Sequence, residues 1–180
     1  GSEMCIRDRY YHLVLLAENN EGYENLTKIV SKGFVEGYYY KPRVDKELLR
    51  TCHKGIIALS ACLAGEVPRY LTKGMYEEAK DRALEYQEIF GKGNYFLELQ
   101  DHGIPDQQLV NQQLMKLSQE TGIELVATND VHYTYADDAK AHDILLCIQT
   151  GKKLSDENRM RYEGGQYYVK SEEEMAALFP

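Results

Sequence analysis

The chain has 180 residues, of which 43% are hydrophobic and 28% are charged, as is ordinary for one soluble globular domain. No apolar run approaches the ~20 residues that span a bilayer, so we expect no membrane anchor. A net charge of -8 argues against wholesale coating of nucleic acid by this segment. The four cysteines are far apart and form no Cys-x-x-Cys pair, which indicates a reducing cytosol and a cytoplasmic protein.

The first nine residues, GSEMCIRDR, show no hydrophobic periodicity and run abruptly into an apolar segment. They lack the apolar core of a signal peptide. The string SEMCIRDR resembles translated sequencing-adapter read-through, so we interpret residues 1–9 as a non-native leader. The last residues, 176–180, stop in or just after a helix, and we expect both ends of the chain to be cut.

From residue 10 onward, strand-like and helix-like segments alternate. Short apolar runs predict strands at 10–18, 55–62, 95–100 and 124–128, with a further short strand at 166–169. The spacing of apolar residues predicts helices at 22–37, 65–73, 75–90, 105–122 and 135–150. Asp45 is expected to cap a short helix that runs to Arg50, and Ser171 with Glu174 forms a capping box for a last helix. The alternation predicts an α/β fold of the barrel type, with parallel strands in one curved sheet and helices outside.

Polar residues directly after the strand at 124–128 are the best chemical signal. Asp130 and His132 lie in TNDVHY, where a functional residue of a β/α barrel is expected. In an extended segment, residues two apart point to one face, so a carboxylate and an imidazole would stand together, as in half of a Zn or Mn site. The alternative is a turn aspartate beside a histidine that is hydrogen-bonded to the backbone.

Two further residues stand near strand ends. Cys62 follows the strand at 55–62 in the same way, although a free cysteine is more often a small buried hydrophobe. His12 lies at the start of the first strand, where a satisfied core histidine is the commoner case. A further polar cluster lies in FLELQDHG and consists of Glu98, Asp101 and His102. These residues are either ligands, residues that orient ligands, or a polar loop, and the residues alone favour the loop.

No phosphate-binding glycine loop and no serine nucleophile elbow occurs in the sequence. The 15 tyrosines can stack on bases, but most are expected to be core or loop anchors. The residues by themselves therefore indicate an α/β domain with a candidate metal site and no more.

Several segments together carry a resemblance. They are HLVLLAENNEGYENLTKIVS, GYYYKPRVD, GIIALSACLAGEV, YFLELQDHG, LVATNDVHY, AHDILLCIQTGK and QYYVKSEEEM. In this order they resemble the alpha subunit of bacterial DNA polymerase III, a C-family replicative polymerase, in the later part of its PHP (polymerase and histidinol phosphatase) domain. The resemblance runs from about Tyr10 to Phe179, and VATNDVHY followed by AHDILLCIQTGK is specific to that family.

The resemblance implies a partial, distorted β/α barrel of the PHP fold whose N-terminal strands, with their opening H-x-H segment, are missing. It implies a PHP domain at 10–150 and, at 151–180, the start of a connection towards the polymerase palm. The matching metal ligands are Asp130, His132, Cys62 and His12, and we retain Glu98 and His102 as candidates that orient them. The carboxylates that perform nucleotidyl transfer, with their Mg²⁺, would lie beyond this chain, so none of its residues is expected to catalyse polymerisation.

The implied function is DNA replication by template-directed synthesis, with Zn or Mn at a PHP site that supports 3′–5′ exonuclease activity. The implied partners are DNA, other replicase subunits and a proofreading exonuclease. Two alternatives stay open. The first is a PHP domain that is a non-catalytic scaffold docking that exonuclease. The second is a standalone PHP phosphatase, which would have no use for the segment from CIQTGK to KSEEEM.

Overall fold

The structure is a computed structural model that describes residues 10–179. The expected leader, residues 1–9, lies outside the described residues. The chain folds into two compact units. The first unit contains the residues up to Glu98 together with Leu109–Val126, and the second contains Leu99–Gln108 and the residues from Ala127 onward. Each unit is described by itself.

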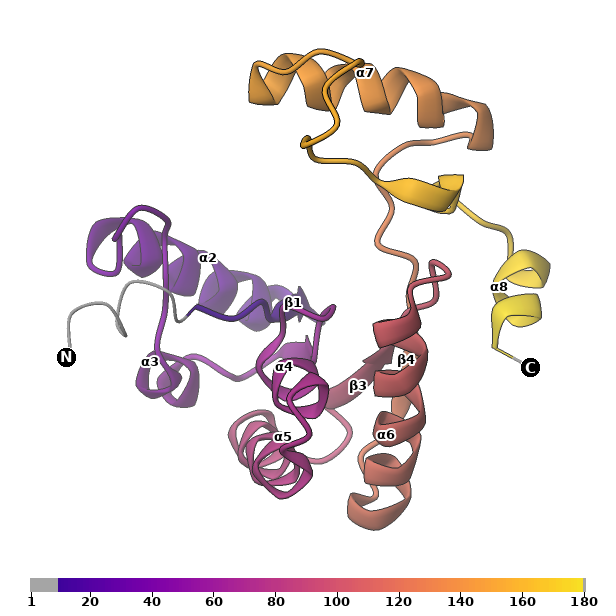
Figure 1. The fold of residues 1–180 in the computed structure, drawn as a ribbon. Coiled ribbons are helices and arrows are strands. Elements are labelled where there is room, and N and C mark those ends of the chain that lie inside the picture. Colours follow the sequence, from indigo (N-terminus) through magenta and orange to yellow (C-terminus); the bar gives the residue numbers. More distant parts are fainter. Residues whose placement is uncertain (1–9, 180) are drawn as a thin grey trace, which may run out of the picture. The chain divides into compact units, whose positions relative to one another are not determined.

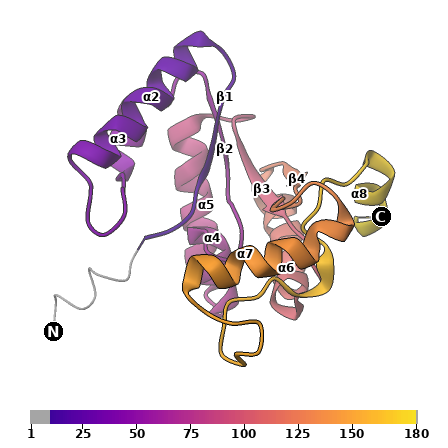
Figure 2. The same cartoon turned by 90° about the horizontal axis from the view of Figure 1, so that it is seen from above.

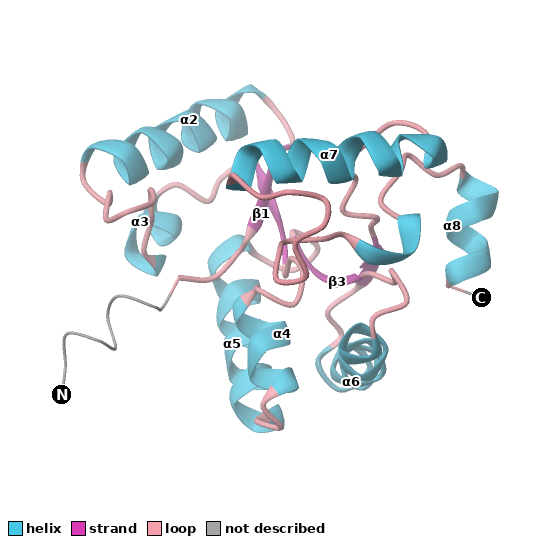
Figure 3. Ribbon diagram, turned by 45° about the horizontal axis from the view of Figure 1, so that its top comes forward, coloured by secondary structure: helices cyan, strands magenta, loops and turns pink. Residues whose placement is uncertain are grey.

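The secondary structure alternates much as expected (Figure 1). The first part of the chain forms β1 (Val14–Ala17), α2 (Asn20–Val35), α3 (Lys46–Thr51), β2 (Ile56–Leu59), α4 (Glu66–Thr72), α5 (Tyr76–Phe90), β3 (Tyr95–Leu99), α6 (Pro105–Thr121) and β4 (Leu125–Ala127). The later part forms η1 (Ala136–Asp138), α7 (Ala139–Thr150), η2 (Glu163–Gly165) and α8 (Glu172–Leu178). The helices are longer than the strands between them (Figure 3). The fold is therefore mixed α/β.

The strands form one open four-stranded sheet in the order β1-β2-β3-β4. β2 and β3 are parallel. Between β3 and β4, Leu97 donates its N–H to Glu124 O at 2.9 Å and Thr128 donates to Leu99 O at 3.0 Å, so the bonds advance in one direction along both strands, as in a parallel pair. β1 is antiparallel to β2, with Ala17 opposite Ile56. The expectation that all four strands are parallel is therefore wrong at β1.

The segment between β1 and β2 explains this reversal. α2 leads away from the end of β1 and packs along it (Figure 2), and α3 brings the chain back to the same end of the sheet. Glu18 donates its N–H to Gly55 O at 2.9 Å, so the exit of β1 and the entry of β2 are neighbours. A Cβ on Gly22 would lie 1.8 Å from Gly55 O, so only glycine allows α2 to approach β2 this closely.

The core of the first unit lies between the two central strands and the helices that cover them. Ala58 of β2 and Leu97 of β3 are fully buried. Ala83 of α5 and Leu117 of α6 are equally buried, so one helix face from each is committed to the core. β2 and β3 are therefore rigid supports for the loops that follow them.

Capping residues fix the ends of two helices as expected. The Asp45 carboxylate accepts the Leu48 N–H at 2.9 Å at the start of α3. Ser171 and Glu174 form the predicted capping box of α8. The strand expected at 166–169 is reduced to a single parallel bridge between Tyr133 and Tyr168. Among residues 10–179, no helix is both long enough and apolar enough to cross a membrane.

Candidate metal centre

His12 and Cys62 form a pair in the first unit. The Sγ of Cys62 lies 3.6 Å from Nδ1 of His12. The His12 main chain donates its N–H to Ala64 O at 3.0 Å, which holds the residue beside the loop after β2. Because β1 is antiparallel to β2, the start of β1 lies next to the end of β2. If β1 were parallel to β2, His12 would lie at the opposite end of the strands from Cys62.

The loop that carries Cys62 is tightly folded. Ala61 has a positive φ of 64°, which is unfavourable for a residue with a side chain. Gly65 donates its N–H to Cys62 O at 2.8 Å. A Cβ on Gly65 would lie 2.0 Å from Ser60 O, so glycine is required there. The loop thus stores backbone strain next to the candidate ligand.

The separation of these two donor atoms fits a zinc ion. With Zn–S of about 2.3 Å, Zn–N of about 2.0–2.1 Å and tetrahedral angles, the sulfur and nitrogen ligands of one ion lie roughly 3.6 Å apart. The Nδ1 and Sγ atoms stand 3.6 Å apart. A thiolate and an imidazole are also the donor types that zinc prefers. The same distance is compatible with a weak S–H···N hydrogen bond.

Asp130 and His132 form a second pair, in the second unit. Asp130 has a positive φ of 44°, so the segment turns at this residue, and the expectation from an extended backbone does not apply. The Nδ1 of His132 lies 2.7 Å from the carbonyl oxygen of Asp130 and donates to it. This bond leaves Nε2 of His132 as the unprotonated nitrogen, which is how metal-binding histidines are commonly held. Both side chains are exposed.

Aromatic rings surround His132. Its ring centroid lies 4.3 Å from that of Tyr162, 5.6 Å from that of Tyr167 and 5.7 Å from that of His142. Asp143, the neighbour of His142, is bound by both terminal guanidinium nitrogens of Arg159, Nη1 at 2.5 Å and Nη2 at 2.7 Å. This hydrogen-bonded pair lowers the pKa of the Asp143 carboxyl. The His132 ring is therefore held by packing, and Asp143 serves the ion pair with Arg159.

His102 is buried and both its ring nitrogens are engaged within the second unit. Gln107 accepts the His102 N–H through Oε1 at 2.8 Å, so its Nε2 donates to His102 Nδ1 at 3.0 Å. The proton of the ring is consequently on Nε2, which donates to Asn129 O at 2.8 Å. The ring stacks on Tyr167 with centroids 4.2 Å apart. His102 thus contacts the residue before Asp130 rather than presenting a nitrogen to a ligand.

Glu98 lies in β3 and is 5% exposed. Its N–H donates to Ser60 Oγ at 2.8 Å, which connects β3 to the residue that opens the Cys62 loop. Among residues 10–179, no three His, Cys, Asp or Glu side chains gather into a metal-binding group. The candidate ligands stand as two pairs, one in each unit, and a shared site for them stays a prediction.

A family model described as the PHP domain matches residues 1–102 of the sequence. The chain belongs to the PHP domain family. The matched part of this PHP chain contains four of the candidate residues, His12, Cys62, Glu98 and His102. Asp130 and His132 come after it.

The chain is also similar, over nearly its whole length, to curated proteins named DNA polymerase III subunit alpha. That of Treponema pallidum is 50% identical over 179 residues, which are 99% of this chain and 15% of the relative. That of Borreliella burgdorferi is 48% identical over 169 residues, with 94% and 15% covered. That of Deinococcus radiodurans is 52% identical over 170 residues, with 94% and 13% covered. The PHP chain therefore spans about a seventh of the length of these relatives.

Proposed function

We propose that this chain is part of the PHP domain of a DNA polymerase III alpha subunit and acts in DNA replication. The observation that carries the proposal is the similarity to such subunits, which extends far beyond residue 102 to 94–99% of the chain. We further propose that the open sheet is one part of a distorted β/α barrel. Template-directed synthesis would be performed by carboxylates outside this chain, together with the Mg²⁺ that they bind.

A PHP metal site is the second part of the proposal. His12, Cys62, Asp130 and His132 would hold Zn or Mn, which when bound activates water and holds the scissile phosphate of a DNA 3′ end. Two observations support this ligand set. The Nδ1–Sγ separation of 3.6 Å suits one tetrahedral ion, and the bond from His132 Nδ1 to Asp130 O leaves the lone pair of the ring on Nε2. Cys62 would bind as a thiolate.

Glu98 and His102 are proposed to orient this site. His102 acts through Asn129, whose carbonyl accepts its proton at 2.8 Å, and Glu98 acts through Ser60 at the start of the Cys62 loop. Residues of this kind fix the positions of ligands without touching the metal.

Two alternatives stand beside this proposal. In the first, the PHP domain is a scaffold that docks a separate proofreading exonuclease and its site is vestigial. In the second, the protein is a standalone PHP phosphatase. The similarity to polymerase subunits after residue 102 disfavours the second alternative.

The decisive experiment uses the complete subunit that carries this chain. The double variant Asp130→Ala/His132→Ala should lose bound Zn or Mn and any metal-dependent 3′–5′ exonuclease activity, while polymerisation survives. Asp137→Ala/His53→Ala, which changes the same residue types elsewhere, should retain both. Unchanged metal content in the first variant would refute the ligand set. Absence of bound metal and of exonuclease activity from the unmodified subunit would favour the scaffold.

A further inference from the structure

The segment 166–170 lies beside the loop that carries Asp130 and His132. It falls within residues 151–180, where a connection towards the polymerase palm is expected. Tyr167 O accepts two main-chain N–H groups, from His132 at 2.8 Å and from Tyr133 at 3.3 Å. Val169 donates its N–H to Thr134 O at 3.2 Å, so the two segments are joined at both ends.

The side chain of Asn129 is bound at both of its polar atoms by the same segment. Its Nδ2 donates to Tyr168 O, and its Oδ1 accepts from Lys170 Nζ at 3.2 Å. The Lys170 ammonium also donates to Gln166 O and lies 4.1 Å from the centre of the Tyr168 ring. Lys170 is half-buried, so its ammonium group makes these contacts instead of being fully solvated.

These contacts act on a strained residue. Asp130, which follows Asn129 directly, has a φ of 44°, and such a conformation persists only where the surroundings determine it. Asn129 is held on one side by Lys170 and by Tyr168 O, and on the other by His102 through its carbonyl. The Tyr167 ring, 6% exposed, lies against both His102 and His132. The segment 166–170 therefore contacts both Asn129, which precedes Asp130, and the ring of His132, which follows it.

We propose that Tyr167 and Lys170 are positioning residues for the Asp130–His132 pair, so that the segment 166–170 is a working part of the metal site. This inference rests on the proposed metal-binding function. Tyr167 sets the His132 ring by packing and its main chain by hydrogen bonds, and Lys170 sets Asp130 through the amide of Asn129. Neither residue touches the metal.

The test measures zinc affinity and hydrogen exchange in the complete subunit. Lys170→Met keeps the aliphatic stem and removes the ammonium, and Tyr167→Leu removes the ring. Each should weaken zinc binding by about 10-fold or more, as loss of a residue that orients a ligand commonly does. Each should also speed amide exchange at residues 132–133, whose N–H groups Tyr167 O accepts. Tyr167→Phe, which keeps the ring, should restore both properties.

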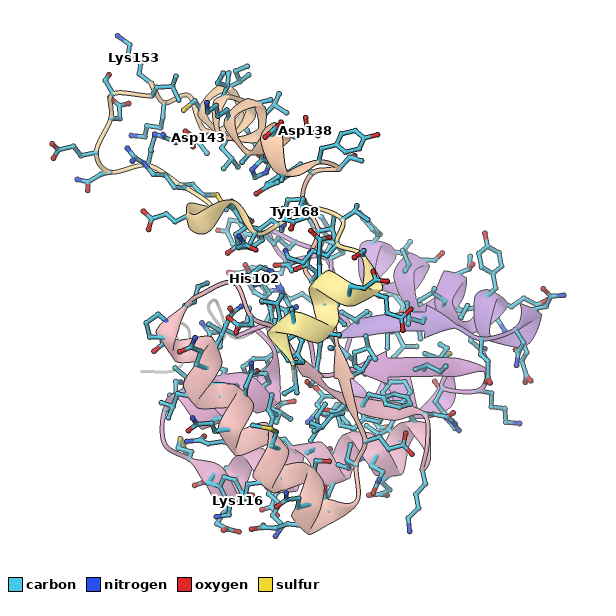
Figure 4. All side chains as sticks on the ribbon, turned by 90° about the vertical axis from the view of Figure 1, so that its right-hand side faces the viewer. His102, Lys116, Asp138, Asp143, Lys153 and Tyr168 are labelled. Atoms are coloured by element: carbon cyan, nitrogen blue, oxygen red, sulfur yellow. The ribbon has the colours of Figure 1, made fainter. Side chains whose placement is uncertain are left out.

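Lys153→Met is the matched control, because Lys153 is an exposed lysine of the same unit (Figure 4). It should change neither zinc affinity nor exchange. Global unfolding, followed in parallel, distinguishes a local effect from loss of the fold. If Lys170→Met and Tyr167→Leu bind zinc normally while Asp130→Ala/His132→Ala does not, the positioning role is wrong and the ligand set stands. If the last variant also binds zinc normally, both proposals fail.

Discussion

Nδ1 of His12 lies 3.6 Å from Sγ of Cys62, although 50 residues separate them in the chain. The contact depends on the direction of β1. Because β1 is antiparallel to β2, its first residues run beside the loop after β2, where Gly65 lets the main chain fold back on Ser60. An exception to the parallel pattern therefore brings together two of the four candidate ligands.

The first prediction concerns the sulfur ligand. In the complete subunit loaded with Co²⁺ in place of zinc, Cys62 should give a thiolate-to-metal charge-transfer band in the near ultraviolet. Cys62→Ser should remove this band, because a hydroxyl is a harder and weaker donor to this kind of ion. Cys52→Ser, at another free and partly buried cysteine, should keep it. A band that persists in Cys62→Ser would exclude Cys62 as a ligand.

The second prediction concerns the close approach of α2 to β2. Gly22→Ala should lower the free energy of unfolding by about 3 kcal/mol, since the added Cβ would overlap the backbone of Gly55. In Gly33→Ala, in the same helix, the added Cβ would lie 3.2 Å from the Val44 side chain and 3.4 Å from Arg43 O, so this variant should stay within about 1 kcal/mol of the unmodified protein. Denaturant unfolding monitored by circular dichroism measures both. Equal effects of the two changes would contradict the proposed packing constraint.

The third prediction concerns the pH dependence of stability at Glu85. Burial raises the pKa of its carboxyl, but the ion pairs with Lys46 at 2.6 Å and Arg82 at 3.0 Å outweigh burial and leave the pKa below its ordinary value of 4.5. Since the folded-state pKa is the lower one, the stabilisation is fully present above about pH 4.5 and is lost as the pH falls through the folded-state value.

Unfolding titrations between pH 7 and pH 3 check this sign. Glu85→Gln should be less stable at pH 7 and should lose less stability than the unmodified protein on acidification. Glu77→Gln, on the first turn of the same helix α5 and exposed, should follow the unmodified protein. If stability falls equally with pH in Glu85→Gln and in the unmodified protein, Glu85 does not contribute to the pH dependence of stability.

The fourth prediction concerns association through β1. It is the first strand in the order of the described sheet, and its Leu16 is 48% exposed. An apolar edge strand invites pairing with another chain, so the 180-residue chain should associate in sedimentation velocity experiments. Leu16→Lys should reduce this association, and Leu84→Lys, at an exposed leucine of α5, should not. A monodisperse, cooperatively melting monomer of the unmodified chain would contradict the prediction.

Local signals in the sequence predicted most of the elements, because helix periodicity, capping residues and short apolar runs act within a few residues. The capping roles of Asp45, Ser171 and Glu174 are confirmed, and the helices and the four main strands form near the expected positions. The family assignment also follows from the sequence, since motifs such as VATNDVHY are themselves local. The same resemblance implies metal ligands at Asp130, His132, Cys62 and His12, and this ligand set stays a prediction.

The tertiary structure decided what depends on residues far apart in the chain. β1 runs antiparallel to β2, and a close approach between Gly22 and Gly55 accompanies this pairing, but no periodicity within β1 predicts the direction. Asp130 adopts a positive φ in a loop held by His102 and Lys170, which lie 28 and 40 residues away and contact its neighbour Asn129. Strand direction and loop strain are set by such long-range hydrogen bonds and close backbone contacts. Spacing along the chain therefore identified candidate ligands, and only the fold showed what holds them.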